Sequence, residues 1–174
     1  QDASSERRFS AKLDALTYVY NIAYPGVRQI GGVPVSNQTF AGQYLSPVLQ
    51  YRVSPQLTLN AGFFTGLPVG DTQRFHAVQP ILSAEYEMVP DMRVVAGALH
   101  RNHPFVDALF NDAMLFVRPI EQGFQLLVAR EHYQQDLFIN WSQVETFQKA
   151  ERFDVGYAGR VSAGHFSLNG QVYW

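Results

Sequence analysis

The segment RFDVGYAGRVSAGHFSLNGQVYW (residues 152–174) decides the fold, because apolar and polar residues alternate strictly along two parts of it. The apolar faces of these two parts are Phe153, Val155, Tyr157, Gly159 and Val161, and Phe166, Leu168, Gly170, Val172 and Trp174. Alternation with a period of two is typical of β-strands that separate apolar from polar surroundings. Residues 162–164 (Ser-Ala-Gly) are typical of a tight turn. We therefore expect an antiparallel hairpin here.

The same alternation recurs along the rest of the chain. It predicts nine strands, at residues 9–21, 39–54, 57–66, 76–89, 92–100, 121–132, 134–143, 151–162 and 164–174. The evidence for a helix is confined to Asp107–Phe116, where Leu109, Ala113 and Phe116 have helical spacing. Because that pattern is short, we favour a turn within a long loop there.

The connections between these strands alternate in length. Short turns are expected at 54–56, 90–91, 132–133 and 162–164, and long connections at 22–38, 67–75, 101–120 and 144–150. Outer-membrane β-barrels have this asymmetry, with short turns at one end and long loops at the other. A soluble β-sandwich also has alternating strands, but nothing in its architecture sorts the connections by side.

The composition narrows the function class. The chain has 174 residues, with 13 Lys+Arg against 15 Asp+Glu, and no cysteine. The near-balance of charge excludes a strongly basic nucleic-acid footprint. Without cysteine there is no disulfide framework and no thiolate metal site. No stretch approaches the roughly 18 apolar residues of a spanning helix. We expect a single domain over residues 1–174, with 1–8 as a disordered N-terminal segment.

Two segments resemble a known class of proteins. YRVSPQLTLNAGFF (51–64) looks like a hairpin of bacterial outer-membrane β-barrel proteins, and Phe166–Trp174 resembles their C-terminal assembly signal. The resemblance implies an all-β fold, an antiparallel up-and-down transmembrane β-barrel of about nine or ten strands. It implies a location in the bacterial outer membrane and contact with outer-membrane lipid. Further barrel subunits or a protein partner are possible partners; nucleic acid is not.

Nine strands place the two chain ends at opposite ends of the barrel, whereas such barrels normally have an even number of strands and both termini at the same end. Either a tenth strand lies around residues 105–118, or the chain is part of a larger barrel.

A porin-like passive channel for small solutes, rather than an enzyme, is the function that this class suggests. The loop 101–120 is the expected constriction, and no cofactor is expected. The charged residues on the polar faces are the candidates for lining the lumen: Lys12, Asp14, Arg52, Glu85, Glu87, Asp136, Arg152, Asp154 and Arg160. Two alternatives are a non-conducting barrel whose outer loops bind a partner, and a soluble lipocalin-like or β-sandwich binder with its apolar faces inward.

Two groups of residues suggest chemistry, and we assign a site to neither. His100 and His103, followed by Asp107 and Asp112, have ligand types that hold metals, but such residues are common at a barrel rim. His165 and Ser167 share the polar face of the last strand and suggest a Ser–His pair for acyl transfer, like that of barrel lipases. Catalytic, cofactor-binding and metal residues are therefore predicted to be absent.

Aromatic residues near the expected strand ends are typical of a membrane girdle. The candidates are Tyr51, Phe63, Tyr86, Trp141 and Trp174.

Overall fold

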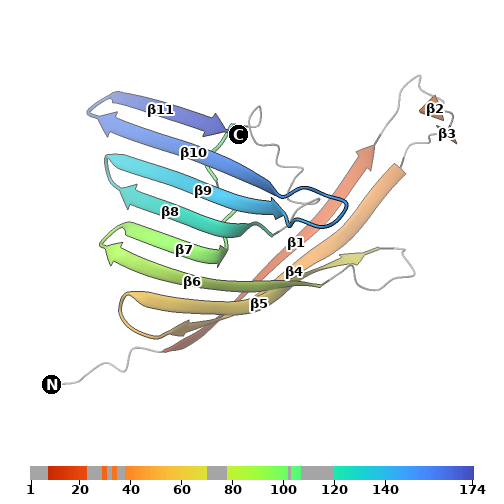
Figure 1. Cartoon of the computed structure of the whole chain (residues 1–174), viewed down its shortest axis with the longest axis horizontal. Coiled ribbons are helices and arrows are strands. Elements are labelled where there is room, and N and C mark those ends of the chain that lie inside the picture. Colours follow the sequence, from red (N-terminus) through yellow and green to blue (C-terminus); the bar gives the residue numbers. More distant parts are fainter. Residues whose placement is uncertain are drawn as a thin grey trace.

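The computed structural model describes residues 8–22, 29–30, 33–34, 38–69, 78–101, 103–106 and 120–174. Nine of its strands form one curved antiparallel sheet in the order β1-β4-β5-β6-β7-β8-β9-β10-β11 (Figure 1). These strands are β1 (Phe9–Ile22), β4 (Gln38–Arg52), β5 (Leu57–Pro68), β6 (Gln79–Val89), β7 (Met92–Ala98), β8 (Gln122–Arg130), β9 (Tyr133–Gln143), β10 (Arg152–Ala163) and β11 (Phe166–Tyr173). A separate two-stranded ladder pairs β2 (Gln29–Ile30) with β3 (Val33–Pro34).

The up-and-down sheet confirms the predicted fold class, because every strand of the large sheet pairs with its predicted neighbours. The strand bounds differ from the predicted ones by a few residues. The described residues contain no helix, and accordingly none that is long and apolar enough to span a membrane. The possible helix at Asp107–Phe116 lies outside the described residues, as does most of the possible tenth strand at 105–118.

The tight turns all lie at one end of the sheet, on the left in Figure 1. Asp91 and Gly164 have positive φ angles of 68° and 57° in two of these turns, the left-handed conformation that short hairpin turns require. The longer connections lie at the opposite end, as the sequence predicts. The sheet is not closed, and β1 and β11 form its two edges.

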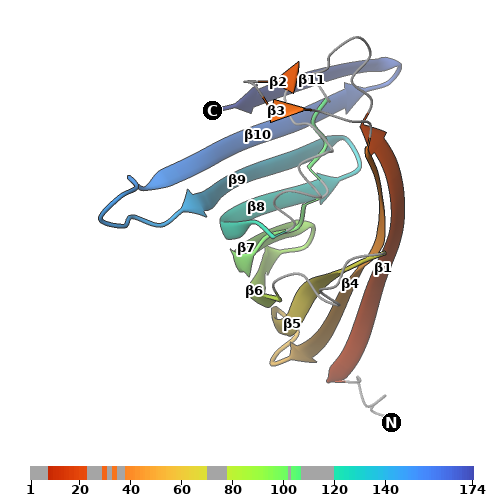
Figure 2. The same ribbon diagram turned by 90° about the vertical axis from the view of Figure 1, so that its right-hand side faces the viewer.

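The two faces of the sheet differ in polarity, as the alternation predicts. Large apolar side chains on the convex face are exposed, for example Phe124 (64%) and Leu168 (76%). Figure 2 shows the sheet curling from β11 round to β1, so that its opposite face is concave. This polarity is the reverse of that expected for the soluble binder, whose apolar faces would point inward. That alternative is therefore wrong.

The best-packed part of the molecule lies on the concave face of β7 to β10. Val95, Phe138 and Ala158 are almost completely buried there, in strands β7, β9 and β10. Residues 99–101 and 103–106, which follow β7 and are together called segment 99–106, contribute to this packing. Residues 94–99 contain no polar side chain, so alternation alone does not orient this strand. The structure buries Val95 together with Ala98 and Leu99.

Candidate functional site

The candidate site is built on one row of concave-face residues that runs across the sheet. Strand register places Glu85 opposite Val95, Val95 opposite Gln125 and Gln125 opposite Phe138. Phe138 in turn lies opposite Gly156. Side chains on one face of adjacent strands are neighbours, so this row of residues from five strands, β6 to β10, lies against segment 99–106.

Segment 99–106 is fixed to the sheet by hydrogen bonds to its main chain. The Leu99 N–H donates to the Glu121 carbonyl (2.9 Å). The Gln125 amide bonds His100 in both directions: its oxygen accepts from the His100 N–H (2.9 Å) and its nitrogen donates to the His100 carbonyl (3.0 Å). Gln171 likewise donates to the Pro104 carbonyl (2.9 Å) and accepts from the Val106 N–H (3.0 Å). These bonds hold the segment against β8 and β11.

His103 lies at the centre of this arrangement, between two carboxylates. Its Nδ1 is 2.7 Å from Asp136 Oδ2, and its Nε2 is 2.7 Å from Glu121 Oε2. Gln125 Nε2 donates to the other Asp136 oxygen (2.9 Å). The histidine side chain is completely buried (0% exposed) and the two carboxylates are nearly so. We call His103, Asp136, Glu121 and Gln125 the histidine cluster.

The electrostatics of the cluster favour a protonated histidine. Burial lowers the pKa of His103, but the hydrogen bonds to Asp136 and Glu121 and the charges of these carboxylates outweigh it and raise the pKa above its ordinary value of 6.5. The Arg101 Nε lies 3.6 Å from Glu121 Oε1. A protonated histidine and an arginine then balance two carboxylates, as buried charges require.

Aromatic rings set the position of the imidazole. The His103 ring stacks on Phe138, with centroids 3.9 Å apart and 23° between the planes. Phe105 packs edge-on against Phe138 at 6.0 Å. Gly156 makes room for these rings, since a Cβ there would overlap the Phe138 ring and lie 3.0 Å from Phe105. The imidazole is therefore held by packing as well as by charge.

A second polar group adjoins the first. Glu85 accepts from Asn60 Nδ2 (2.7 Å) and Arg93 Nη1 (3.0 Å), and its Oε1 is 3.2 Å from His100 Nε2. A cavity of about 260 Å³ lies beside it on the concave face, lined in part by Ser83, Glu85, His100 and Arg101. Space for a ligand therefore adjoins the segment that carries His103.

The predicted lumen-lining residues fall into two groups. Glu85, Asp136 and Asp154 are buried, whereas Glu87 is half-buried. The others are exposed: Lys12, Asp14, Arg52, Arg152 and Arg160.

The girdle candidates are all at least partly exposed. The Tyr51 ring packs against Phe9 in a tilted arrangement, with ring centroids 4.6 Å apart. The remaining candidates are exposed: Phe63, Tyr86, Trp141 and Trp174.

The structure separates one of the two residue pairs that the sequence suggested for chemistry and brings the other into adjoining polar groups. His165 lies in the turn between β10 and β11, and Ser167 Oγ accepts from Arg160 Nε (3.1 Å); among the described residues no hydrogen bond joins His165 to Ser167. His100 and His103 lie in two adjoining polar groups, while Asp107 and Asp112 lie outside the described residues.

Sequence reasoning missed Glu121, Gln125 and the role of Phe138. One signal was available: Phe138 occupies a polar face between Asp136 and Asn140.

Comparison with known proteins gives one family. The model of a family described as Lipid A 3'-O-deacylase-type matches residues 1–174. It is a family of outer-membrane β-barrel proteins. No curated protein matches the chain.

This family match corrects two predictions from the sequence. The porin-like passive channel and the absence of enzymatic activity are both wrong, because the family is one of deacylases. The non-conducting partner-binding barrel fits the family no better. The physical reason is general: channels and barrel enzymes share the same alternating strands, so the fold pattern cannot distinguish them.

Proposed function

The chain belongs to the Lipid A 3'-O-deacylase-type family, and from this we propose that it hydrolyses the acyl ester at the 3'-oxygen of lipid A in the bacterial outer membrane. The exposed apolar convex face supports a place in the bilayer, because strands of such barrels turn apolar side chains to lipid. Tyr51, Phe63, Tyr86, Trp141 and Trp174 remain our proposed interfacial girdle.

One observation carries the assignment of the site: the fully buried imidazole of His103 lies 2.7 Å from a carboxylate oxygen at each ring nitrogen. A histidine oriented by a carboxylate is the commonest general base in ester hydrolysis. Asp136, itself fixed by Gln125, holds the Nδ1 side and thereby directs Nε2. We assign His103 as the general base and Asp136 as its positioning residue.

The proposed reaction uses water as the nucleophile. His103 acts in its neutral form, which is populated above its raised pKa. It accepts a proton at Nε2 while the water oxygen bonds to the ester carbonyl carbon. When the tetrahedral intermediate collapses, the bond to the 3'-oxygen breaks and His103 returns its proton to that oxygen. The products are a free fatty acid and lipid A with a 3'-hydroxyl. The step requires His103 Nε2 to release its hydrogen bond to Glu121 and to bind the water instead. It also requires the ester to reach the concave face.

Glu121 and Arg101 have supporting roles in this proposal. Glu121 holds Nε2 before the substrate enters and, once released, can hold the attacking water. Arg101, near Glu121, provides positive charge on the side where the oxyanion develops. Preorganised positive charge in a site that excludes water stabilises such an oxyanion strongly.

The test is a deacylation assay with the whole chain refolded in detergent micelles. Purified lipid A is the substrate, and mass spectrometry follows the loss of one ester-linked acyl group and the appearance of the fatty acid. We expect His103→Asn to lower the rate by about 10²–10⁴-fold, the usual contribution of general acid–base catalysis. Asp136→Asn should lower it substantially, because the imidazole loses its orientation.

His165→Asn and Ser167→Ala are the matched controls, since they remove the other His and Ser considered from sequence. Heat-modifiable gel mobility shows whether each variant is folded. Full activity of folded His103→Asn would refute the assignment of the base, and loss of activity in Ser167→Ala would move the site to β11. A folded wild-type chain that releases no fatty acid from lipid A would refute the proposed function itself.

A further inference from the structure

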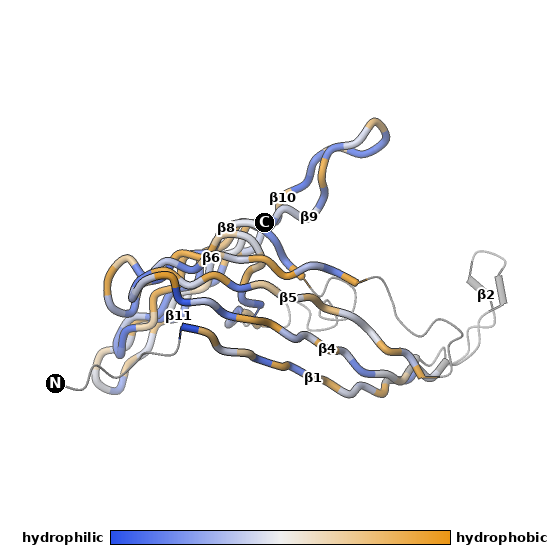
Figure 3. The backbone as a smooth tube through the Cα atoms, turned by 90° about the horizontal axis from the view of Figure 1, so that it is seen from below, coloured by the Kyte–Doolittle hydropathy of each residue, from blue (hydrophilic) through white to orange (hydrophobic). Residues whose placement is uncertain are grey.

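The connection between β9 and β10 leaves the sheet on its convex side, away from the histidine cluster. Figures 2 and 3 both show this hairpin projecting beyond the rest of the sheet, on the side opposite to β1. Its turn is an ordered structure. Thr146 and Lys149 form an antiparallel bridge, and Thr146 Oγ1 also accepts from the Lys149 N–H (3.1 Å). The hairpin lies at the end of the sheet that has the long connections.

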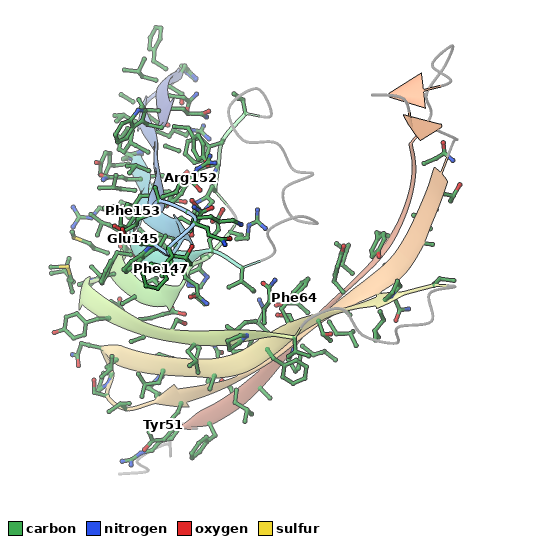
Figure 4. All side chains as sticks on the ribbon, turned by 45° about the vertical axis from the view of Figure 1, so that its right-hand side comes forward. Tyr51, Phe64, Glu145, Phe147, Arg152 and Phe153 are labelled. Atoms are coloured by element: carbon green, nitrogen blue, oxygen red, sulfur yellow. The ribbon has the colours of Figure 1, made fainter. Side chains whose placement is uncertain are left out.

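Apolar side chains continue from the convex face onto this hairpin. At its base, the Trp141 and Phe153 rings pack 5.3 Å apart, and both residues are about half exposed. At its tip, Phe147 is fully exposed and Val144 is 65% exposed. Figure 4 labels Glu145 and Phe147 of the hairpin close to Arg152 and Phe153. The hairpin therefore extends an apolar surface instead of ending it.

The charges of the hairpin favour no strongly charged partner. Glu145 and Glu151 are balanced by Lys149 and Arg152, so residues 143–152 carry no net charge. Apolar rings surrounded by polar and oppositely charged groups suit the boundary between lipid headgroups and acyl chains. Because this exposed apolar patch continues the convex face that we place in the bilayer, we expect lipid to cover the patch as well.

We propose that hairpin 144–150 inserts Phe147 into the headgroup–acyl boundary of the membrane leaflet at the long-connection end. The hairpin then anchors β9 and β10, the strands that carry Asp136, Phe138 and Gly156, to the lipid. This inference rests on the membrane placement in the proposed function. It adds to that function a lipid-contacting element outside the barrel wall.

Site-directed spin labelling tests the placement directly, because the chain contains no cysteine. Phe147→Cys, labelled with a nitroxide, is reconstituted in phosphatidylcholine vesicles. The label's collision rates with oxygen, which concentrates in lipid, and with a water-soluble nickel chelate are then measured. Asn169→Cys is the matched control, since position 169 lies on the concave face of β11 and lines a different cavity. Val144→Cys provides a second probe of the hairpin.

We expect oxygen to relax the label at 147 more than the nickel chelate does, and the reverse at 169. Greater relaxation by nickel at both 147 and 144 would place the hairpin in water and overturn the inference. Protection of 147 from both reagents would mean that a second copy of the chain covers it, which also overturns the inference. The same vesicles are assayed with lipid A, so a lipid-immersed label without deacylation would refute only the enzymatic proposal. Active protein with a water-exposed label would refute only the anchor.

Discussion

Strands β1 and β4 and strands β8 and β9 share the same alternation, but their concave faces have different environments. On β1, Lys12 and Asp14 form an ion pair (2.8 Å) whose side chains are 62% and 58% exposed. On β9, Asp136 is buried beneath segment 99–106 and bonds a buried histidine. Alternation therefore determines which face of the sheet carries a charged side chain. A segment that covers that face determines whether the charge is exposed to water or is buried and paired. Only the covered region has the low dielectric in which paired charges become chemically useful.

The largest expected effect is the loss of a covered charge. We expect Asp136→Ala to lower the free energy of unfolding by about 3–5 kcal/mol, because it leaves His103 buried without one of its partners. Asp14→Ala, the matched change on the open region, should cost no more than about 1 kcal/mol, since exposed ion pairs contribute little. Urea unfolding in micelles measures both. Equal effects would show that segment 99–106 does not alter the energetics of the sheet.

The second largest expected effect is that of adding a methyl group in a tightly packed region, compared with adding one in an open region. Gly156→Ala places a Cβ against the Phe138 ring, so we expect overpacking to lower the free energy of unfolding by about 1–3 kcal/mol. Gly170→Ala, on neighbouring β11, meets nothing within 4 Å. That change should be neutral or stabilise the protein by about 0.4–1 kcal/mol through the unfolded chain. The measurement is thermal unfolding in micelles, and a tolerated Gly156→Ala would contradict the tight ring packing.

Sequence predicts the open region well and the covered region poorly, and the reason is physical. Period-two alternation is a local property, so it predicted the strands and their order. The return of segment 99–106 onto the sheet depends on contacts between residues far apart in the chain, such as His103 with Asp136. Nothing in the spacing of the loop residues predicts such a contact.

The cluster was missed for the same reason. Gln125 and Glu121 resemble any polar residues at a strand and its start, and His103 was weighed only as a metal ligand or a rim residue. Phe138 on a polar face, opposite Gly156, was the strongest local signal, because an aromatic ring there needs a partner and space. The function was even harder to predict from the alternation, because a general resemblance to outer-membrane barrels does not identify a site.

The pH dependence should be confined to the covered region. Because the folded pKa of His103 is raised, its charge interactions stabilise the protein fully below the unfolded pKa, and this stabilisation is lost as pH rises through the folded pKa. The stability difference between wild type and His103→Gln should therefore shrink above pH 6.5, by about 1.4 kcal/mol for each unit of raised pKa.

Urea unfolding at several pH values checks the pH dependence. The double variant Lys12→Ala/Asp14→Ala should keep the wild-type dependence of the free energy of unfolding on pH. If the stability difference between wild type and His103→Gln is the same at all pH values, the paired imidazolium is contradicted. Deacylation should rise over the same pH range, because the base must be neutral to accept a proton.

The smallest expected effect concerns the ion pair of the open region itself. A double-mutant cycle on Lys12 and Asp14 should give a coupling energy of about 0.2–1 kcal/mol, because solvent screens both exposed groups. The coupling should fall further in 1 M salt, where the screening length is only about 3 Å. A coupling of several kcal/mol that resists salt would mean that another element covers β1 and β4 as segment 99–106 covers β8 and β9. The two regions would then differ in which element covers them, and not in whether they are covered.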